Sequence, residues 1–194
     1  MERLVAFGCS YTFGQALPGA IFDKKIPSNL SWPSMLAQHL GVDVENQGEP
    51  GASNLEILWK ILNFNFDSSD MCFIMWSHFT RASIFREEGF KRLDFHTLSK
   101  YEKSWLRVHP EYDQIVHNWI YIHHATTYLN TLGIQPYHLL SGGSHPDPTK
   151  TITVPRILES KFHFIDRGDD NDHPGVHSHA LLAGQIASEL LRIT

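Results

Sequence analysis

Short apolar segments alternate with longer segments of helical periodicity along this chain, and this alternation restricts its fold more than any other feature. The strand candidates are residues 4–7, 42–44, 71–76, 134–140 and 162–165. The helical patterns cover about 31–40, 53–66 and 112–132, and a last one begins near Pro174. Strands that alternate with helices form a parallel sheet covered by helices on both faces. The sequence therefore predicts an α/β fold with a mostly parallel sheet of five strands.

Length and composition set the outer limits of the prediction. We expect a single domain over residues 1–194, since this length suits one substantial core. The net charge of −5 and the scattered basic residues argue against a nucleic-acid binder. No apolar run reaches the roughly 18 residues of a membrane span, and the first strand begins too early to leave room for a signal peptide. We therefore expect a cytoplasmic protein; a phage-encoded protein, or one exported by another route, would show the same signals.

Candidate functional residues lie where the predicted strands end. Loops at the carboxyl ends of parallel strands form the ligand crevice of such sheets. Ser10 and Gly51 follow the first two strands, Trp76-Ser77-His78 ends the third, and His173 precedes the last helix. We expect these segments to meet at one edge of the sheet.

Ser10, Asp170 and His173 are the residue types that acyl transfer requires. A serine hydroxyl needs a general base, and the imidazole needs a carboxylate that fixes its tautomer. Asp170 lies three residues before His173 in a turn, so both side chains can point the same way. Asp169 and Asp172 are alternative orienting groups. The alternative for all of them is structural, because serine and aspartate also cap helices and turns.

Cysteine and histidine offer rival chemistries. Cys9 is the other candidate nucleophile, but strand alternation points it away from the direction of Ser10. Cys9 and Cys72 are expected to be buried, reduced thiols. His173, His177 and His179 include a metal-like i, i+4 spacing, yet the glutamate of a His-Glu-x-x-His site is missing. We therefore predict no metal.

Three short segments, in order along nearly the whole chain, resemble the first, second and last sequence blocks of the SGNH/GDSL hydrolases. They are Phe7-Gly8-Cys9-Ser10-Tyr11-Thr12, Asn46-Gln47-Gly48-x-x-Gly51-Ala52-Ser53-Asn54 and Asp170-x-x-His173-Pro174. The resemblance implies a flavodoxin-like, three-layer α/β/α sandwich that hydrolyses esters or thioesters, often removing acetyl groups from carbohydrates. It implies no cofactor.

The resemblance also assigns roles to residues. Ser10 is the nucleophile that forms the acyl-enzyme, and Asp170 and His173 complete the catalytic triad. The oxyanion hole takes one backbone N–H from Ser10 and a second from Gly51. The third block departs from the family, because the asparagine that donates its side-chain amide to the oxyanion is absent. Ser77 or His78 is the candidate replacement, and loss of one such donor typically costs about 10²–10³ in rate.

Aromatic and basic residues beyond the third strand are candidates for binding the substrate. Trp76, Phe79 and Arg81, with Trp105, can line a groove for a sugar ring or an anionic group. The alternative places Trp76 in the core and Phe79 over the sheet edge. The insertion at 77–110 and the loop at 141–157 follow strands at the crevice and can form a lid or set specificity.

Taken together, these features predict a serine esterase that removes small acyl groups, acetyl groups on carbohydrate among them. One alternative is a degenerate member of the same fold that binds glycan or a protein partner, which the missing asparagine favours. Another is transfer of the acyl group to an acceptor other than water. The oligomeric state stays open.

Overall fold

The computed structural model describes residues 2–93, 99–100, 103–104, 108, 111–141 and 154–193. Its central sheet contains the parallel strands β1 (Arg3–Gly8), β2 (Asp43–Gly48), β3 (Asp70–Trp76) and β6 (Tyr137–Leu140) in the order β2-β1-β3-β6. The registers pair Phe7 with Gln47 and with Ile74, so the ends of the three strands lie level. The α/β class with a parallel sheet is confirmed.

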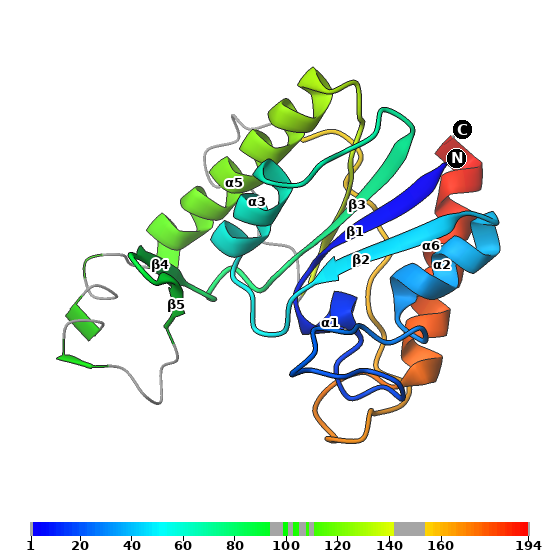
Figure 1. Ribbon diagram of the computed structural model, residues 1–194, viewed down its shortest axis with the longest axis horizontal. Coiled ribbons are helices and arrows are strands. Elements are labelled where there is room, and N and C mark those ends of the chain that lie inside the picture. The colour runs from blue at the N-terminus through cyan, green and yellow to red at the C-terminus, as the bar shows by residue number, and fades with distance from the viewer. Residues whose placement is uncertain are drawn as a thin grey trace.

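Helices cover both faces of the sheet (Figure 1). One face carries α2 (Trp32–Leu40) and α6 (Val176–Ile193), and the other carries α3 (Asn54–Leu62) and α5 (Glu111–Thr131). The side chains of β1 alternate between these layers. Val5 and Phe7 pack toward α3 and α5, whereas Leu4 and Ala6 pack toward α2 and α6. The strand is buried on both faces, as its apolar sequence predicts.

The expected fifth strand at 162–165 is wrong. The sheet has four strands among the described residues, and the chain beside β6 adds only a single bridge, between His138 and Ile157. The backbone N–H of Ile165 instead donates to the Ser178 hydroxyl at the start of α6. The ring of Phe162 packs against His179 of the same helix. These contacts tie the segment to α6 in place of a strand ladder.

The last helix begins later than the proline signal predicts. The sequence predicts a helix that begins near Pro174, and α6 begins two residues later, at Val176. The carboxylate of Asp166 accepts hydrogen bonds from the backbone N–H groups of His177 and Ser178. Asp166 thus caps the helix from ten residues upstream of its first residue, which a search for local capping signals does not detect.

The insertion after β3 folds partly into an antiparallel hairpin. β4 (Ser83–Arg86) pairs with β5 (Gly89–Arg92) apart from the central sheet, and the hairpin lies beside the N-terminal end of α3 (Figure 1). Trp105 and most of the 141–157 loop lie outside the described residues. Within the described part of the chain, no helix combines the length and apolar character needed to cross a membrane.

Candidate active site

A short helix, α1 (Ser10–Phe13), places Ser10 at the carboxyl end of β1. Two glycines allow this helix to approach the sheet closely. A Cβ added to Gly48 would lie 2.9 Å from the Cα of Phe13, and one added to Gly8 would lie 2.9 Å from the carbonyl oxygen of Met75. The side-chain amide of Asn46 donates to the carbonyl of Thr12 and holds the other end of the helix.

Ser10 is the first residue of α1, and its side chain is unusual. The residue is only 2% exposed, and its hydroxyl has no hydrogen-bond partner among the described residues. Its backbone N–H donates to no acceptor within the described part of the chain, as is normal at a helix N-terminus. A buried polar group without a partner costs free energy and calls for an explanation, of which a catalytic role is one.

The predicted second oxyanion donor lies in a tight turn after β2. The N–H of Ala52 donates to the carbonyl of Glu49 at 3.0 Å, and Gly51 has a φ of +78°. Proline followed by glycine with positive φ defines a type II turn over residues 49–52. The turn leaves the N–H of Gly51 without an acceptor among the described residues. Two free backbone donors therefore lie at the ends of β1 and β2, the strands that pair with each other.

Asp170 and His173 form a hydrogen-bonded pair in the loop before α6. The Oδ2 atom of Asp170 lies 2.7 Å from Nδ1 of His173, and its Oδ1 atom accepts from the backbone N–H groups of His173 and Asp172. Burial alone would raise the pKa of Asp170, but these bonds lower it to about 2. The bonded carboxylate favours the imidazole tautomer with a proton on Nδ1, which leaves Nε2 as the available base.

The loop that carries this pair packs against the segment that follows α1. The N–H of Asp169 donates to the carbonyl of Ala16 at 3.0 Å. The ring of His173 meets the ring of Tyr11 edge to face, with centroids 5.8 Å apart. The structure therefore brings His173 beside the neighbour of Ser10 in sequence, although the Ser10 hydroxyl is not bonded to it.

Ser77 and His78, the two candidates for the third oxyanion donor, face different surroundings. Ser77 is fully buried, and its Oγ accepts a hydrogen bond from Arg81 at 3.2 Å. A hydroxyl that accepts still has its own proton to donate. His78 is exposed, and its ring lies 3.1 Å from the hydroxyl of Thr80. The Ser77 side chain is thus buried at the end of β3, whereas the His78 side chain lies at the surface.

Two buried asparagines near Ser77 were not singled out from the sequence. The side chain of Asn54 accepts from the N–H of Ser77 and donates to its carbonyl. Asn54 also donates to Asn118, which in turn donates to the carbonyls of Phe79 and Gln114. Both side-chain amides are therefore engaged in holding the loop after β3. The only sequence signal was the asparagine directly after Ser53 in the second block.

Trp76, Phe79 and Arg81, the proposed substrate-binding residues, differ in exposure. Trp76 is fully buried, and its indole N–H donates to Nδ1 of His138, so it is a core residue. Phe79 is 3% exposed and packs against Trp119. Arg81 is exposed and, with Phe79, lines a pocket of about 260 Å³ between the hairpin and α5. The core interpretation holds for Trp76.

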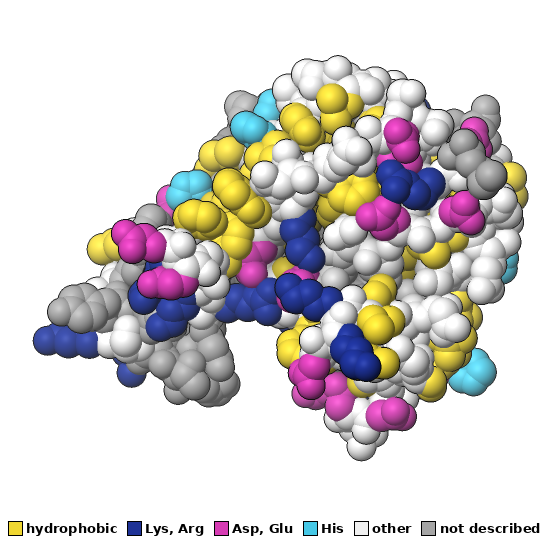
Figure 2. Space-filling model, viewed as in Figure 1, with side chains coloured by type: hydrophobic (Ala, Val, Ile, Leu, Met, Phe, Trp, Pro, Cys, Tyr) yellow, Lys and Arg dark blue, Asp and Glu magenta, His cyan; other side chains and the backbone are white. Residues whose placement is uncertain are grey.

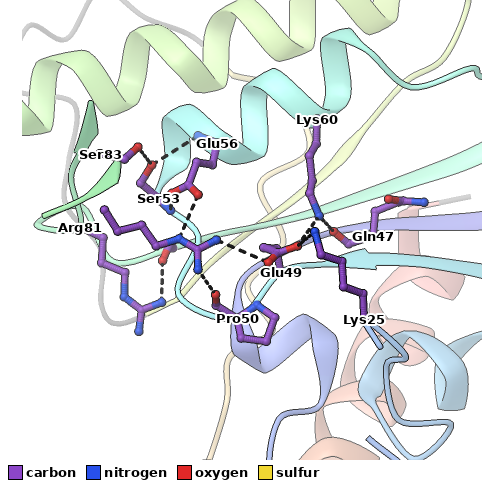
Figure 3. Close-up of polar contacts among 11 residues, drawn as sticks. Lys25, Gln47, Glu49, Pro50, Ser53, Glu56, Lys60, Arg81 and Ser83 are labelled. Atoms are coloured by element: carbon purple, nitrogen blue, oxygen red, sulfur yellow. Dashed lines mark hydrogen bonds and ion pairs between the residues drawn. The ribbon is translucent and has the colours of Figure 1, made fainter. Parts of the chain in front are cut away.

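Basic side chains surround Glu49 beside this site (Figure 3). Lys60 contacts its carboxylate at 3.1 Å, Arg92 at 3.6 Å and Lys25 at 3.9 Å. Burial would raise the pKa of Glu49, but the charges of Lys60, Lys25 and Arg92 outweigh it and lower the pKa. Figure 2 shows lysine and arginine side chains along the hollow between the hairpin and the rest of this face.

The remaining candidates from the sequence are histidines and cysteines. Histidine, cysteine and acidic residues form no metal-binding cluster within the described part of the chain. His179 is buried, and its Nδ1 accepts from the backbone N–H of Trp32, whereas His177 is exposed. Cys9 and Cys72 are both buried and free, and burial raises the pKa of the Cys72 thiol.

Comparison with known proteins gives a fold and no close relative. No family model matches the chain, and no curated protein matches it. Solved structures do match. An acetyl xylan esterase, Est2A, from the rumen bacterium Butyrivibrio proteoclasticus has a TM-score of 0.61 and 13% identity, over 99% of this chain and 64% of that one. This chain therefore spans about two thirds of the length of that esterase.

Two further structures match over their full length. TesA has a TM-score of 0.55 and 15% identity, over 99% of each chain. A member of the lipolytic G-D-S-L family from Veillonella parvula has a TM-score of 0.51 and 12% identity, over 99% of this chain and 100% of that one. Identities this low establish the fold alone. The chain has the fold of the SGNH/GDSL hydrolases, as its three sequence blocks predicted.

Proposed function

We propose that the chain is a serine esterase. Nε2 of His173 removes the hydroxyl proton of Ser10, and Oγ attacks the carbonyl carbon of an ester. The backbone N–H groups of Ser10 and Gly51 donate to the oxyanion that forms. His173 then gives the proton to the departing alcohol. A water molecule, activated by the same imidazole, releases the acyl group as a carboxylic acid.

The observation that carries this proposal is the bonded pair of Asp170 and His173 in a loop packed beside α1. A general base must be oriented by a partner, and the 2.7 Å contact with an ionised carboxylate provides this. The unbonded Ser10 hydroxyl is compatible with a catalytic role, because catalytic hydrogen bonds often form only in the complex with substrate. The free N–H groups of Ser10 and Gly51 support the oxyanion hole.

Ser77 is our candidate for the third oxyanion donor. Its hydroxyl accepts from Arg81 at 3.2 Å and keeps a proton to donate. Asn54 and Asn118 cannot serve without breaking the bonds that hold the loop after β3. His78 points to Thr80 at the surface, which argues against it.

For the substrate we propose a small acyl ester of a sugar or a similar polar alcohol. The support is the fold shared with a structure named as an acetyl xylan esterase and the exposed residue Arg81, whose guanidinium donates to Ser77. Phe79 and Arg81 line the same pocket and are the candidates for contact with the alcohol part.

Two assays on the purified protein test the proposal: hydrolysis of p-nitrophenyl acetate and labelling by a fluorophosphonate probe. We expect the wild type to hydrolyse the ester and to take up one label per chain. Ser10→Ala should abolish both, whereas Cys9→Ala should retain both because its thiol is not the nucleophile. Labelling that survives in Ser10→Ala, or none between about pH 6 and pH 9 in the wild type, contradicts the proposal.

A degenerate member of the fold that binds glycan or a protein partner is the second candidate. The burial of Ser10 and the missing asparagine favour it. It predicts no fluorophosphonate labelling at any pH. Acyl transfer to an acceptor other than water would instead give labelling, with product formed only when the acceptor is present.

A further inference from the structure

Arg92, the last residue of β5, reaches from the inserted hairpin to the turn that contains Gly51. Its Nη1 atom donates to the carbonyl oxygen of Pro50 at 2.6 Å. A Cβ added to Gly51 would lie 3.1 Å from the same Nη1 atom, so the guanidinium lies directly against the glycine. No other side chain in the described part of the chain donates to this carbonyl.

The Pro50 carbonyl and the Gly51 N–H belong to the same peptide unit. In a trans peptide the C=O and N–H bonds point in opposite directions, so fixing one fixes the other. Rotation of this central peptide would convert the type II turn into a type I turn and reverse the N–H. A cation that binds the carbonyl opposes that rotation. It also polarises the peptide and strengthens its N–H as a donor.

The guanidinium is itself held from two further sides. Its Nε donates to Oε1 of Glu56 at 2.9 Å, and Nη2 lies 3.6 Å from the carboxylate of Glu49. Glu56 is fixed because its other oxygen accepts from the N–H of Ser53 in the capping box of α3. The planar guanidinium of arginine can donate to three partners at once. The ammonium group of a lysine would bind the same three partners with poorer hydrogen-bond geometry.

We infer that Arg92 is a positioning residue for the oxyanion hole. It holds the Pro50–Gly51 peptide so that the Gly51 N–H stays directed at the reacting carbonyl, and the hairpin serves to deliver it. The inference rests on the proposed esterase function. It assigns the described part of the insertion a role in transition-state stabilisation, where the sequence suggested a lid or a specificity element.

The test compares kcat and KM of Arg92→Met and Arg92→Lys with the wild type, using p-nitrophenyl acetate. We expect Arg92→Met to lower kcat about 10- to 100-fold with KM within about threefold, since a misdirected donor costs less than or as much as a deleted one. Arg92→Lys should recover part of the loss. Fluorophosphonate titration counts the active sites that react. Because kcat is then expressed per labelled serine, unfolded protein in the sample does not lower the measured kcat.

Ser83→Ala is the matched control. It removes the 2.6 Å contact between the hydroxyls of Ser83 and Ser53, another link from the hairpin to the start of α3, and leaves the Pro50 carbonyl bound. We expect its kcat to stay within about twofold of the wild type.

The outcomes separate the two proposals. An active wild type with Arg92→Met within twofold in kcat per labelled site overturns the role of Arg92 alone. An equal loss in Ser83→Ala also overturns it, because the hairpin would then act only as a scaffold. A wild type without labelling or turnover overturns the esterase proposal, and the role of Arg92 with it.

Discussion

The carboxylate of Asp170 accepts three hydrogen bonds, two from backbone N–H groups and one from the ring of His173. The backbone bonds fix its direction within its own turn, so the imidazole contact does not depend on a long-range fit. They also lower its pKa to about 2, against the effect of burial. The group is therefore ionised throughout the range in which an ester can be assayed.

Asp170→Asn should lower kcat by about 10³–10⁴, because the amide can donate to Nδ1 and so favour the wrong imidazole tautomer. Since the pKa of Asp170 is about 2, the wild-type carboxylate is ionised at every pH between about 5 and 9, and the deficit should be present across that range. Steady-state kinetics of both proteins across that range measure it. Asp172→Asn is the control, since only its backbone N–H meets Asp170. An equal loss in Asp172→Asn would refute the assignment.

Individual side-chain contacts were predictable where spacing determines geometry. Asp170 and His173 lie three residues apart in one turn, and the expected pairing is present. The choice between Ser77 and His78 depended on which side chain faces inward, and one position in a loop carries no such signal. Arg92 was not foreseen, because its contact with Pro50 joins residues 42 positions apart.

At the scale of elements, α1 depends on the two glycines beneath it. A four-residue helix has little intrinsic stability, so its position comes from its contacts with the ends of β1 and β2. Gly48 lies under Phe13, and Gly8 lies against Thr12 and the end of β3. Any side chain at either position would push α1, and Ser10 with it, away from the sheet.

Gly48→Ala should destabilise the fold by about 1–3 kcal/mol, the usual cost of forcing an extra methyl into a packed site. Urea unfolding monitored by circular dichroism measures the change. Gly184→Ala is the matched control, since no atom lies within 4 Å of the added Cβ in the middle of α6. We expect it to be neutral or to stabilise by up to about 1 kcal/mol, because alanine favours helix. Equal stability of the wild type and Gly48→Ala would show that α1 yields without cost.

Element prediction succeeded for the apolar runs that form the sheet and failed where a tertiary contact decided the outcome. The continuous apolar run at 71–76 forms most of β3, and nearly all side chains of this strand are buried. The run at 162–165 forms no strand. Its Phe162 and Phe164 side chains pack against the ring of Tyr11, and the segment is not paired with the sheet. The hairpin of β4 and β5 has charged, half-exposed strands, so it gave no clear alternation.

At the scale of the whole molecule, a neutral histidine is buried on each side of the sheet. His138 of β6 accepts from the indole N–H of Trp76 and contacts Thr126 of α5 through its other nitrogen. His179 of α6 accepts from the N–H of Trp32 at the start of α2. Burial lowers the pKa of each to about 3. A proton on Nδ1 of either histidine would break the hydrogen bond that this nitrogen accepts. Packing on both faces of the sheet therefore depends on neutral imidazoles.

The free energy of unfolding should therefore fall as the pH drops below about 6.5, the ordinary histidine value, toward about 3. The unfolded chain binds these protons first, so stability is full above that window and is lost through it. Between pH 7.5 and pH 5 the loss should be about 2 kcal/mol for each histidine.

His138→Gln should remove about half of this loss of stability in urea titrations, whereas His177→Gln, at an exposed position, should leave the loss unchanged. A wild type whose stability is flat over this range would mean that the two cores open to admit water around the imidazoles.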